Sequence, residues 1–106
     1  MNPRNVLVVI VNYRSAALTL RALASLASER SAPELRLHAV VVENDSGDAE
    51  ALTRGIEASF ADFAELVVSP VNAGFGAGNN LGVRHARERG IPFDYIQLLN
   101  PDTEVR

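Results

Sequence analysis

The feature that most constrains the fold is an unbroken apolar run at residues 6–11, which reads Val-Leu-Val-Val-Ile-Val. Nearly all of these side chains are β-branched, which favours a strand. No polar residue alternates with the apolar ones, so other elements are expected to cover both faces of this strand. Such a strand is typical of a parallel sheet that has helices on both sides.

Three further segments read as strands, at residues 37–42, 65–69 and 94–99. Three predicted helices separate these strands. The first follows Ser15 as its cap and has a stripe of apolar residues, and the second spans about 49–60. The third runs from Asn79 or Asn80 to Arg89. The alternation predicts an α/β fold, a Rossmann-like parallel sheet with right-handed crossovers in a three-layer α/β/α arrangement. We expect residues 1–106 to form a single domain.

Polar side chains follow each predicted strand. They are Asn12 and Tyr13, then Glu43, Asn44 and Asp45, then Asn72, and finally Asn100 and Asp102. The carboxyl ends of parallel strands lie along one edge of a sheet, where ligands bind. The sequence therefore predicts a shared site at this edge.

The last strand ends at Asn100-Pro101-Asp102-Thr103. Pro101 cannot donate to the ladder, so Asp102 lies just past the strand end. We predict that Asp102 anchors a metal ion and a diphosphate. The alternative is an ordinary type I turn, which favours the same residue types.

Residues 72–82 are rich in glycine and invite a dinucleotide-binding interpretation. The spacing fits poorly, because Gly76 and Gly78 are followed by Gly82 and the loop comes after the third strand instead of the first. Close packing of a helix on the sheet explains Gly78 and Gly82 equally well. Asn79 and Asn80 can likewise be helix caps.

Composition excludes several classes of protein. The net charge of -3 argues against nucleic-acid binding, and the absence of lysine excludes a P-loop, a Schiff-base enzyme and a receiver-type signalling domain. No cysteine is present to form a disulfide or a thiolate site. No apolar run could cross a bilayer and no secretory signal is recognisable, so we expect a cytoplasmic protein.

Some residue types that often carry chemistry have simpler interpretations here. His38 and His85 have neither metal-ligand spacing nor a paired carboxylate, and we expect structural or solvated roles for both. Ser15 and Ser46 lack a neighbouring base and are interpreted as cap or turn residues.

Four segments together resemble the inverting nucleotide-sugar glycosyltransferases of family 2, especially the rhamnosyltransferase-like members. The segments are residues 9–13, 41–48, 72–82 and 98–103, in the family's order. The resemblance implies the N-terminal half of a GT-A fold, truncated before the acceptor-binding half. It also implies that the general base lies beyond Arg106, so that this chain alone is inactive or nearly so.

The resemblance also implies residue roles. The expected nucleotide-sugar contacts are Asn12, Tyr13, Glu43, Asn44, Asn79, Asn80 and Asn100, with Asp48 shaping the second loop. Asp102 matches the metal-binding carboxylate of the family's Asp-x-Asp motif, and Mg²⁺ or Mn²⁺ is the expected cofactor. Glu43 stands where an aspartate is usual, and Asn100 replaces the motif's first carboxylate, so metal affinity would depend on Asp102.

The implied reaction transfers a sugar, with rhamnose as the resemblance-based choice, from a nucleoside-diphosphate donor to an acceptor hydroxyl. The acceptor would be a glycan or a lipid-linked molecule in cell-surface polysaccharide or glycolipid synthesis. Peripheral attachment at the cytoplasmic face of the membrane and a homo-oligomer are left open. The alternatives are a dinucleotide-binding module and a non-catalytic interaction domain.

Overall fold

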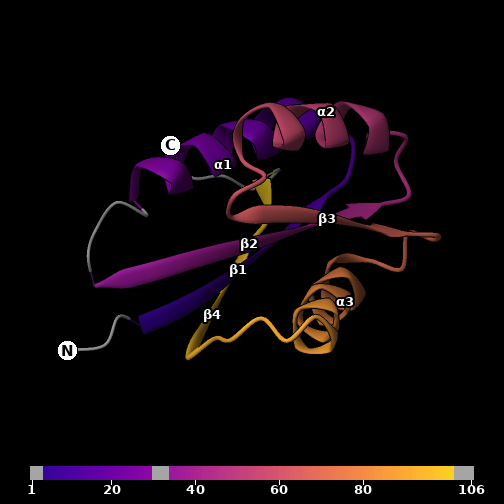
Figure 1. Ribbon diagram of the computed structural model, residues 1–106. Helices are drawn as coiled ribbons and strands as arrows, with labels where there is room; N and C mark the ends of the chain where they lie inside the picture. Colours follow the sequence, from indigo (N-terminus) through magenta and orange to yellow (C-terminus); the bar gives the residue numbers. More distant parts are fainter. Residues whose placement is uncertain (1–3, 30–33, 102–106) are drawn as a thin grey trace.

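The computed structural model describes residues 4–29 and 34–101 (Figure 1). The strands are β1 (Arg4–Asn12), β2 (Leu35–Asn44), β3 (Ala64–Ser69) and β4 (Tyr95–Leu99). The helices are α1 (Ala16–Glu29), α2 (Ala49–Ser59) and α3 (Phe75–Glu88). Every predicted helix and strand is present, and the alternating order is confirmed.

The four strands form one parallel sheet in the order β3-β2-β1-β4. Helices α1 and α2 lie on one face of the sheet and α3 lies on the other, which gives three layers (Figure 1). The predicted Rossmann-like α/β/α architecture is therefore confirmed.

Strand β1 explains why the first apolar run has no polar alternation. Val8 and Ile10 pack in the core under α1 and α2, whereas Leu7 and Val9 pack in the core under α3. All four side chains are completely buried. Both faces of a central parallel strand must be apolar when helices cover both sides.

Helix α3 begins at Phe75, four residues before Asn79, so the predicted cap at Asn79 or Asn80 is wrong. The residue before the helix is Gly74, whose φ of 94° lies in the left-handed region that favours glycine. Because glycine is a poor helix former, the glycines at the start of α3 led to a predicted start that is too late in the chain. Tertiary packing overrides that propensity.

The packing interpretation of the glycines is confirmed inside α3. A Cβ at Gly78 would lie 3.0 Å from both Cγ atoms of Val11, and one at Gly82 would lie 2.5 Å from Cγ1 of Val9. The absence of side chains at Gly78 and Gly82 lets α3 approach β1 closely.

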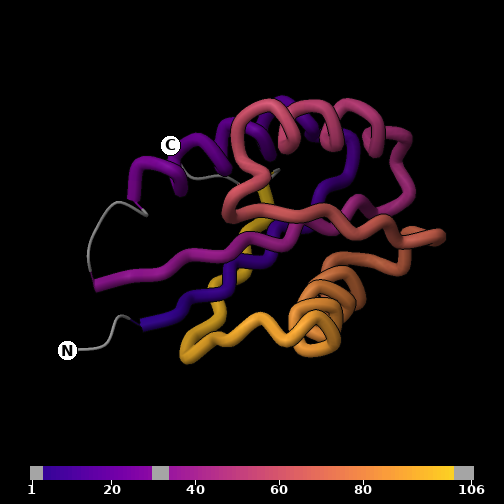
Figure 2. Tube along the Cα trace, viewed as in Figure 1, coloured from indigo at the N-terminus to yellow at the C-terminus, as the bar shows by residue number. Residues whose placement is uncertain are grey.

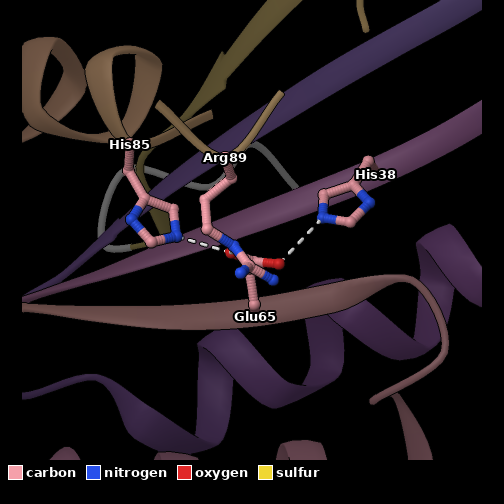
Figure 3. Close-up of polar contacts among 4 residues, drawn as sticks. All are labelled: His38, Glu65, His85 and Arg89. Carbon is pink, nitrogen blue, oxygen red and sulfur yellow. Dashed lines mark hydrogen bonds and ion pairs between the residues drawn. The ribbon is translucent and has the colours of Figure 1, made fainter. Parts of the chain in front are cut away.

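A carboxylate on β3 joins α3 to the sheet (Figure 3). Glu65 makes a short hydrogen bond with Nε2 of His85, accepts one from Nε of Arg89 at 3.2 Å, and lies 3.4 Å from Nε2 of His38. The prediction that the histidines lack a paired carboxylate is therefore wrong. The pairing depends on how α3 is turned on the sheet, which spacing along the chain does not show.

Two effects oppose each other at Glu65. Burial alone would raise the pKa of this carboxyl group, but the hydrogen bonds and the charges of His85 and Arg89 outweigh it and lower the pKa below its ordinary value. The carboxylate form is therefore part of the contact between β3 and α3.

Strand β4 is an edge strand that pairs with β1, and no described strand pairs with its other side. Its side chains are more exposed than those of the central strands: Tyr95 is 51%, Ile96 43% and Leu98 48% accessible. A cavity of about 480 Å³ opens between α1 and the end of β4. The sheet is thus well covered at β1 and β2 and thinly covered at β4.

Candidate functional site

The carboxyl ends of the strands form the candidate site. In Figure 2, β2 and β3 run toward the right-hand side of the view, where each passes into the loop that leads to the next helix. A hollow of about 230 Å³ lies at this edge. Its lining residues are Val11, Tyr13, Asn44, Asn72, Gly74, Phe75 and Asn100. Three of the predicted nucleotide contacts, from three different strand ends, therefore share one hollow.

Asn12 is the last residue of β1 and is completely buried. Its Nδ2 donates to Oε1 of Glu43 at 3.0 Å and to Oδ2 of Asp48 at 2.9 Å. Its Oδ1 accepts from the hydroxyl groups of Thr19, at 2.7 Å, and Ser15, at 3.3 Å. The amide of Asn12 is thus fully used in joining β1, α1 and the loop after β2.

Glu43 is the centre of that network and is 1% exposed. Besides Asn12, it accepts hydrogen bonds from the backbone N–H groups of Ser46 and Asp48, both at 2.9 Å, and from the Ser46 hydroxyl at 2.8 Å. Burial alone would raise the pKa of Glu43, but these hydrogen bonds together lower it below its ordinary value. Glu43 is therefore a buried carboxylate that shapes the loop after β2.

Glu43 has one methylene group more than the aspartate that is usual at this position, and its longer side chain contacts the following loop. From the end of β2, the side chain reaches two backbone N–H groups of the following loop, at Ser46 and Asp48. The contact with base and ribose expected of Asn12 and Glu43 stays a prediction. Their observed contacts are with other residues of the protein.

A second link joins β2 to the loop before α3. Oδ1 of Asn72 accepts from Nδ2 of Asn44 at 2.8 Å and from the backbone N–H of Gly74 at 3.0 Å. This fixes the left-handed turn at Gly74 and, with it, the start of α3. Asn72 was noted in the sequence as a strand-end residue but was assigned no role.

The two asparagines of α3 lie apart from the lining of the hollow. Asn79 is 6% exposed, and its Oδ1 has no hydrogen-bond partner among the described residues. Asn80 is exposed on the helix surface. Their predicted contact with the sugar nucleotide stays a prediction.

Asn100 lines the hollow and Pro101 follows it as a buried residue, as expected for a chain that leaves the sheet at this point. Asp102, the predicted metal ligand, lies outside the described residues. Within residues 4–29 and 34–101, no group of three or more His, Asp or Glu side chains could hold a metal ion.

Thr19, which no sequence pattern singled out, donates a hydrogen bond from its hydroxyl to Asn12. Thr19 is completely buried on the face of α1 that meets the sheet. Ser46 was interpreted as a turn residue, and its contacts with Glu43 give it a second role. A polar residue within the apolar stripe of a helix is a usable signal, because buried hydroxyl groups need partners.

The fold and the site together define a class. A parallel sheet in three layers, with polar residues gathered at its carboxyl edge, corresponds to the Rossmann-like N-terminal half of the GT-A fold. The family model for glycosyl transferase family 2 matches residues 7–106. The chain therefore belongs to glycosyl transferase family 2, and this membership implies a glycosyltransferase that uses a nucleotide sugar.

No curated protein and no solved structure gives a significant match to the chain. In the part of the chain that the structure describes, none of the three helices has the length and apolar character needed to span a bilayer.

Proposed function

We propose that this chain supplies the donor-binding part of an inverting glycosyltransferase, which transfers a sugar from a nucleoside diphosphate to an acceptor hydroxyl group. The observation that carries the proposal is the convergence of Tyr13, Asn44 and Asn100 on one hollow. These residues come from the ends of β1, β2 and β4. An aromatic ring and amide groups are suited to a nucleobase and its sugar, because the ring can stack and the amides both donate and accept.

Asn12 and Glu43 contribute to this function by supporting the loops. Their hydrogen bonds hold the ends of β1 and β2 together, next to Tyr13 and Asn44 of the hollow. A site held by buried contacts keeps its shape before the ligand arrives, which reduces the cost of binding.

A divalent cation of the Mg²⁺ or Mn²⁺ type is also part of the proposal. Such an ion can be held by one carboxylate together with substrate phosphate oxygens, and we assign that carboxylate to Asp102. Asn100, which lines the hollow two residues earlier, would add an amide oxygen close by. When bound, the cation would offset the negative charge of the departing nucleoside diphosphate.

The finer features of the function are also part of the proposal. Rhamnose is the proposed sugar, and a glycan or lipid-linked molecule of the cell surface is the proposed acceptor. A carboxylate general base outside the described residues would activate the acceptor hydroxyl. The cytoplasm, including the cytoplasmic face of the membrane, is the proposed location.

Calorimetry with UDP, dTDP, GDP and NAD, each with and without Mn²⁺, tests the donor site. We expect binding of one nucleoside diphosphate that strengthens with Mn²⁺. Asp102→Asn should remove most of this metal effect, because the amide carries no charge to attract the cation.

The matched control is Glu57→Gln, which removes one negative charge from an exposed position on α2. It should leave both nucleotide affinity and the metal effect unchanged. Tight binding of NAD without a metal requirement would contradict the proposal and favour a dinucleotide-binding module.

A further inference from the structure

The loops at the carboxyl edge carry an uneven charge. Glu43, Asp45 and Asp48 bring three carboxylates to the end of β2 and the loop after it. In the described loops that follow the four strands, Arg14 is the one basic residue. A ligand that carries phosphate groups would meet an acidic surface here, so the position of this guanidinium group matters.

Arg14 is held in a defined backbone conformation. Its φ of 55° lies in the left-handed region, which a side chain of this size rarely adopts. The backbone N–H donates to Oγ of Ser46 at 2.9 Å, and the same hydroxyl donates to Glu43. The buried network around Glu43 therefore extends to the backbone of Arg14.

The Arg14 side chain is directed by an aromatic ring. Its guanidinium carbon lies 5.1 Å from the centroid of the ring of Tyr13, which is one of the residues that line the hollow. No carboxylate of the described residues pairs with this guanidinium, although Asp45 and Asp48 lie in the neighbouring loop. Among the described residues, Arg14 thus keeps its hydrogen-bond donors available, next to a residue that lines the hollow.

We infer that Arg14 binds the diphosphate group of the nucleotide donor. This inference rests on the proposed function and adds a residue to its site. The planar guanidinium carries paired N–H donors that match phosphate oxygens, and stacking on Tyr13 limits the orientations of the group before binding. The protein then supplies a fixed positive charge for the diphosphate in addition to any charge from a metal ion.

The test compares each nucleoside diphosphate with its own nucleoside. Binding of UDP and uridine, dTDP and thymidine, and GDP and guanosine is measured by NMR titration without metal, on the wild-type chain and on Arg14→Gln. We expect the substitution to weaken binding of the diphosphate by about tenfold to a hundredfold, the range for a hydrogen bond to a charged group. The nucleoside, which lacks phosphate, should bind as before.

Two variants complete the design. Arg84→Gln removes an exposed arginine from α3 and should change neither affinity. Arg14→Lys keeps the charge without the paired donors and should fall between wild type and Arg14→Gln.

The outcomes separate the inference from the proposed function. If Arg14→Gln binds diphosphate as tightly as Arg84→Gln does, or loses nucleoside and diphosphate in equal measure, the role given to Arg14 is wrong and the donor site stands. If the wild-type chain binds none of the nucleotides with or without Mn²⁺, the donor site itself is wrong, and the role of Arg14 with it.

Discussion

Asn12 donates a hydrogen bond to Glu43 at 3.0 Å, and the two residues are register partners at the ends of the adjacent strands β1 and β2. Both side chains are buried, at 0% and 1% exposure. A buried carboxylate remains charged only when enough donors surround it. This pair therefore couples the stability of the sheet to the shape of the site.

Asn12→Ala should lower the free energy of unfolding by about 2 to 3 kcal/mol, because it leaves the buried Thr19 hydroxyl and part of Glu43 without a partner. Urea unfolding followed by circular dichroism measures the loss. Asn80→Ala, at an exposed position on α3, is the control and should not reduce stability. Equal stability of the two variants would contradict the role assigned to Asn12.

Glu43 should make the protein less stable in acid. Its pKa is lowered in the folded state, so its contribution is fully present above the unfolded value of about 4.5 and is lost as the pH falls through the folded pKa. The pKa of Glu65 is also lowered, so acid should reduce the stability of the protein through both carboxylates. The contribution of Glu43 is therefore measured as the difference in free energy of unfolding between wild type and Glu43→Gln. The free energy of unfolding of wild type and Glu43→Gln, measured from pH 7 to pH 3, should converge below pH 4.5. Parallel curves would show that the carboxylate is not stabilised by the fold.

Gly82→Ala should destabilise the protein by about 1 to 3 kcal/mol, the usual cost of overpacking. The added methyl group would lie 2.5 Å from Cγ1 of Val9 and 3.2 Å from Cγ2 of Val42, both in the core under α3. The double variant Gly82→Ala/Val9→Ala should lose less stability than the sum of the two single variants, since the second change removes one of the clashing side chains.

Gly76→Ala is the matched control for that substitution. It lies in the same helix, but a Cβ there meets no atom within 4 Å. Because alanine is the better helix former, this variant should be more stable than wild type by about 0.5 to 1 kcal/mol. Thermal unfolding of both variants distinguishes packing from backbone propensity; equal effects would contradict the close approach of α3 to β1.

Glu65→Gln should loosen α3 without unfolding the sheet. The substitution removes the charge that pairs with His85 and Arg89, at a cost of about 1 kcal/mol. Hydrogen exchange should therefore speed up at the amides of α3 more than at those of α2. A uniform change across both helices would mean that Glu65 acts on global stability alone.

The sequence carried most of the information about the fold, because continuous apolar runs such as residues 6–11 have few other uses than a buried strand. It also located the strand-end residues of the site. It could not show the direction of each side chain. Asn12 contacts Glu43 because the register between β1 and β2 places the two residues opposite each other. No local sequence pattern encodes this register.

Two other features lay beyond local patterns for similar reasons. The start of α3 depends on the link between Asn72 and Gly74 and on close packing against Val9, and these contacts outweigh the poor helix propensity of glycine. The contact of His85 with Glu65 joins residues far apart in the chain.

The thin cover of β4 has a consequence for handling the protein in solution. No strand of residues 4–29 and 34–101 pairs with the outer side of β4, where the apolar side chains of Ile96 and Leu98 are also exposed. Such an edge is a template on which another extended chain can add. Self-association at high concentration should start at this segment, and Leu98→Lys should suppress it, because a charged side chain on an edge strand opposes pairing.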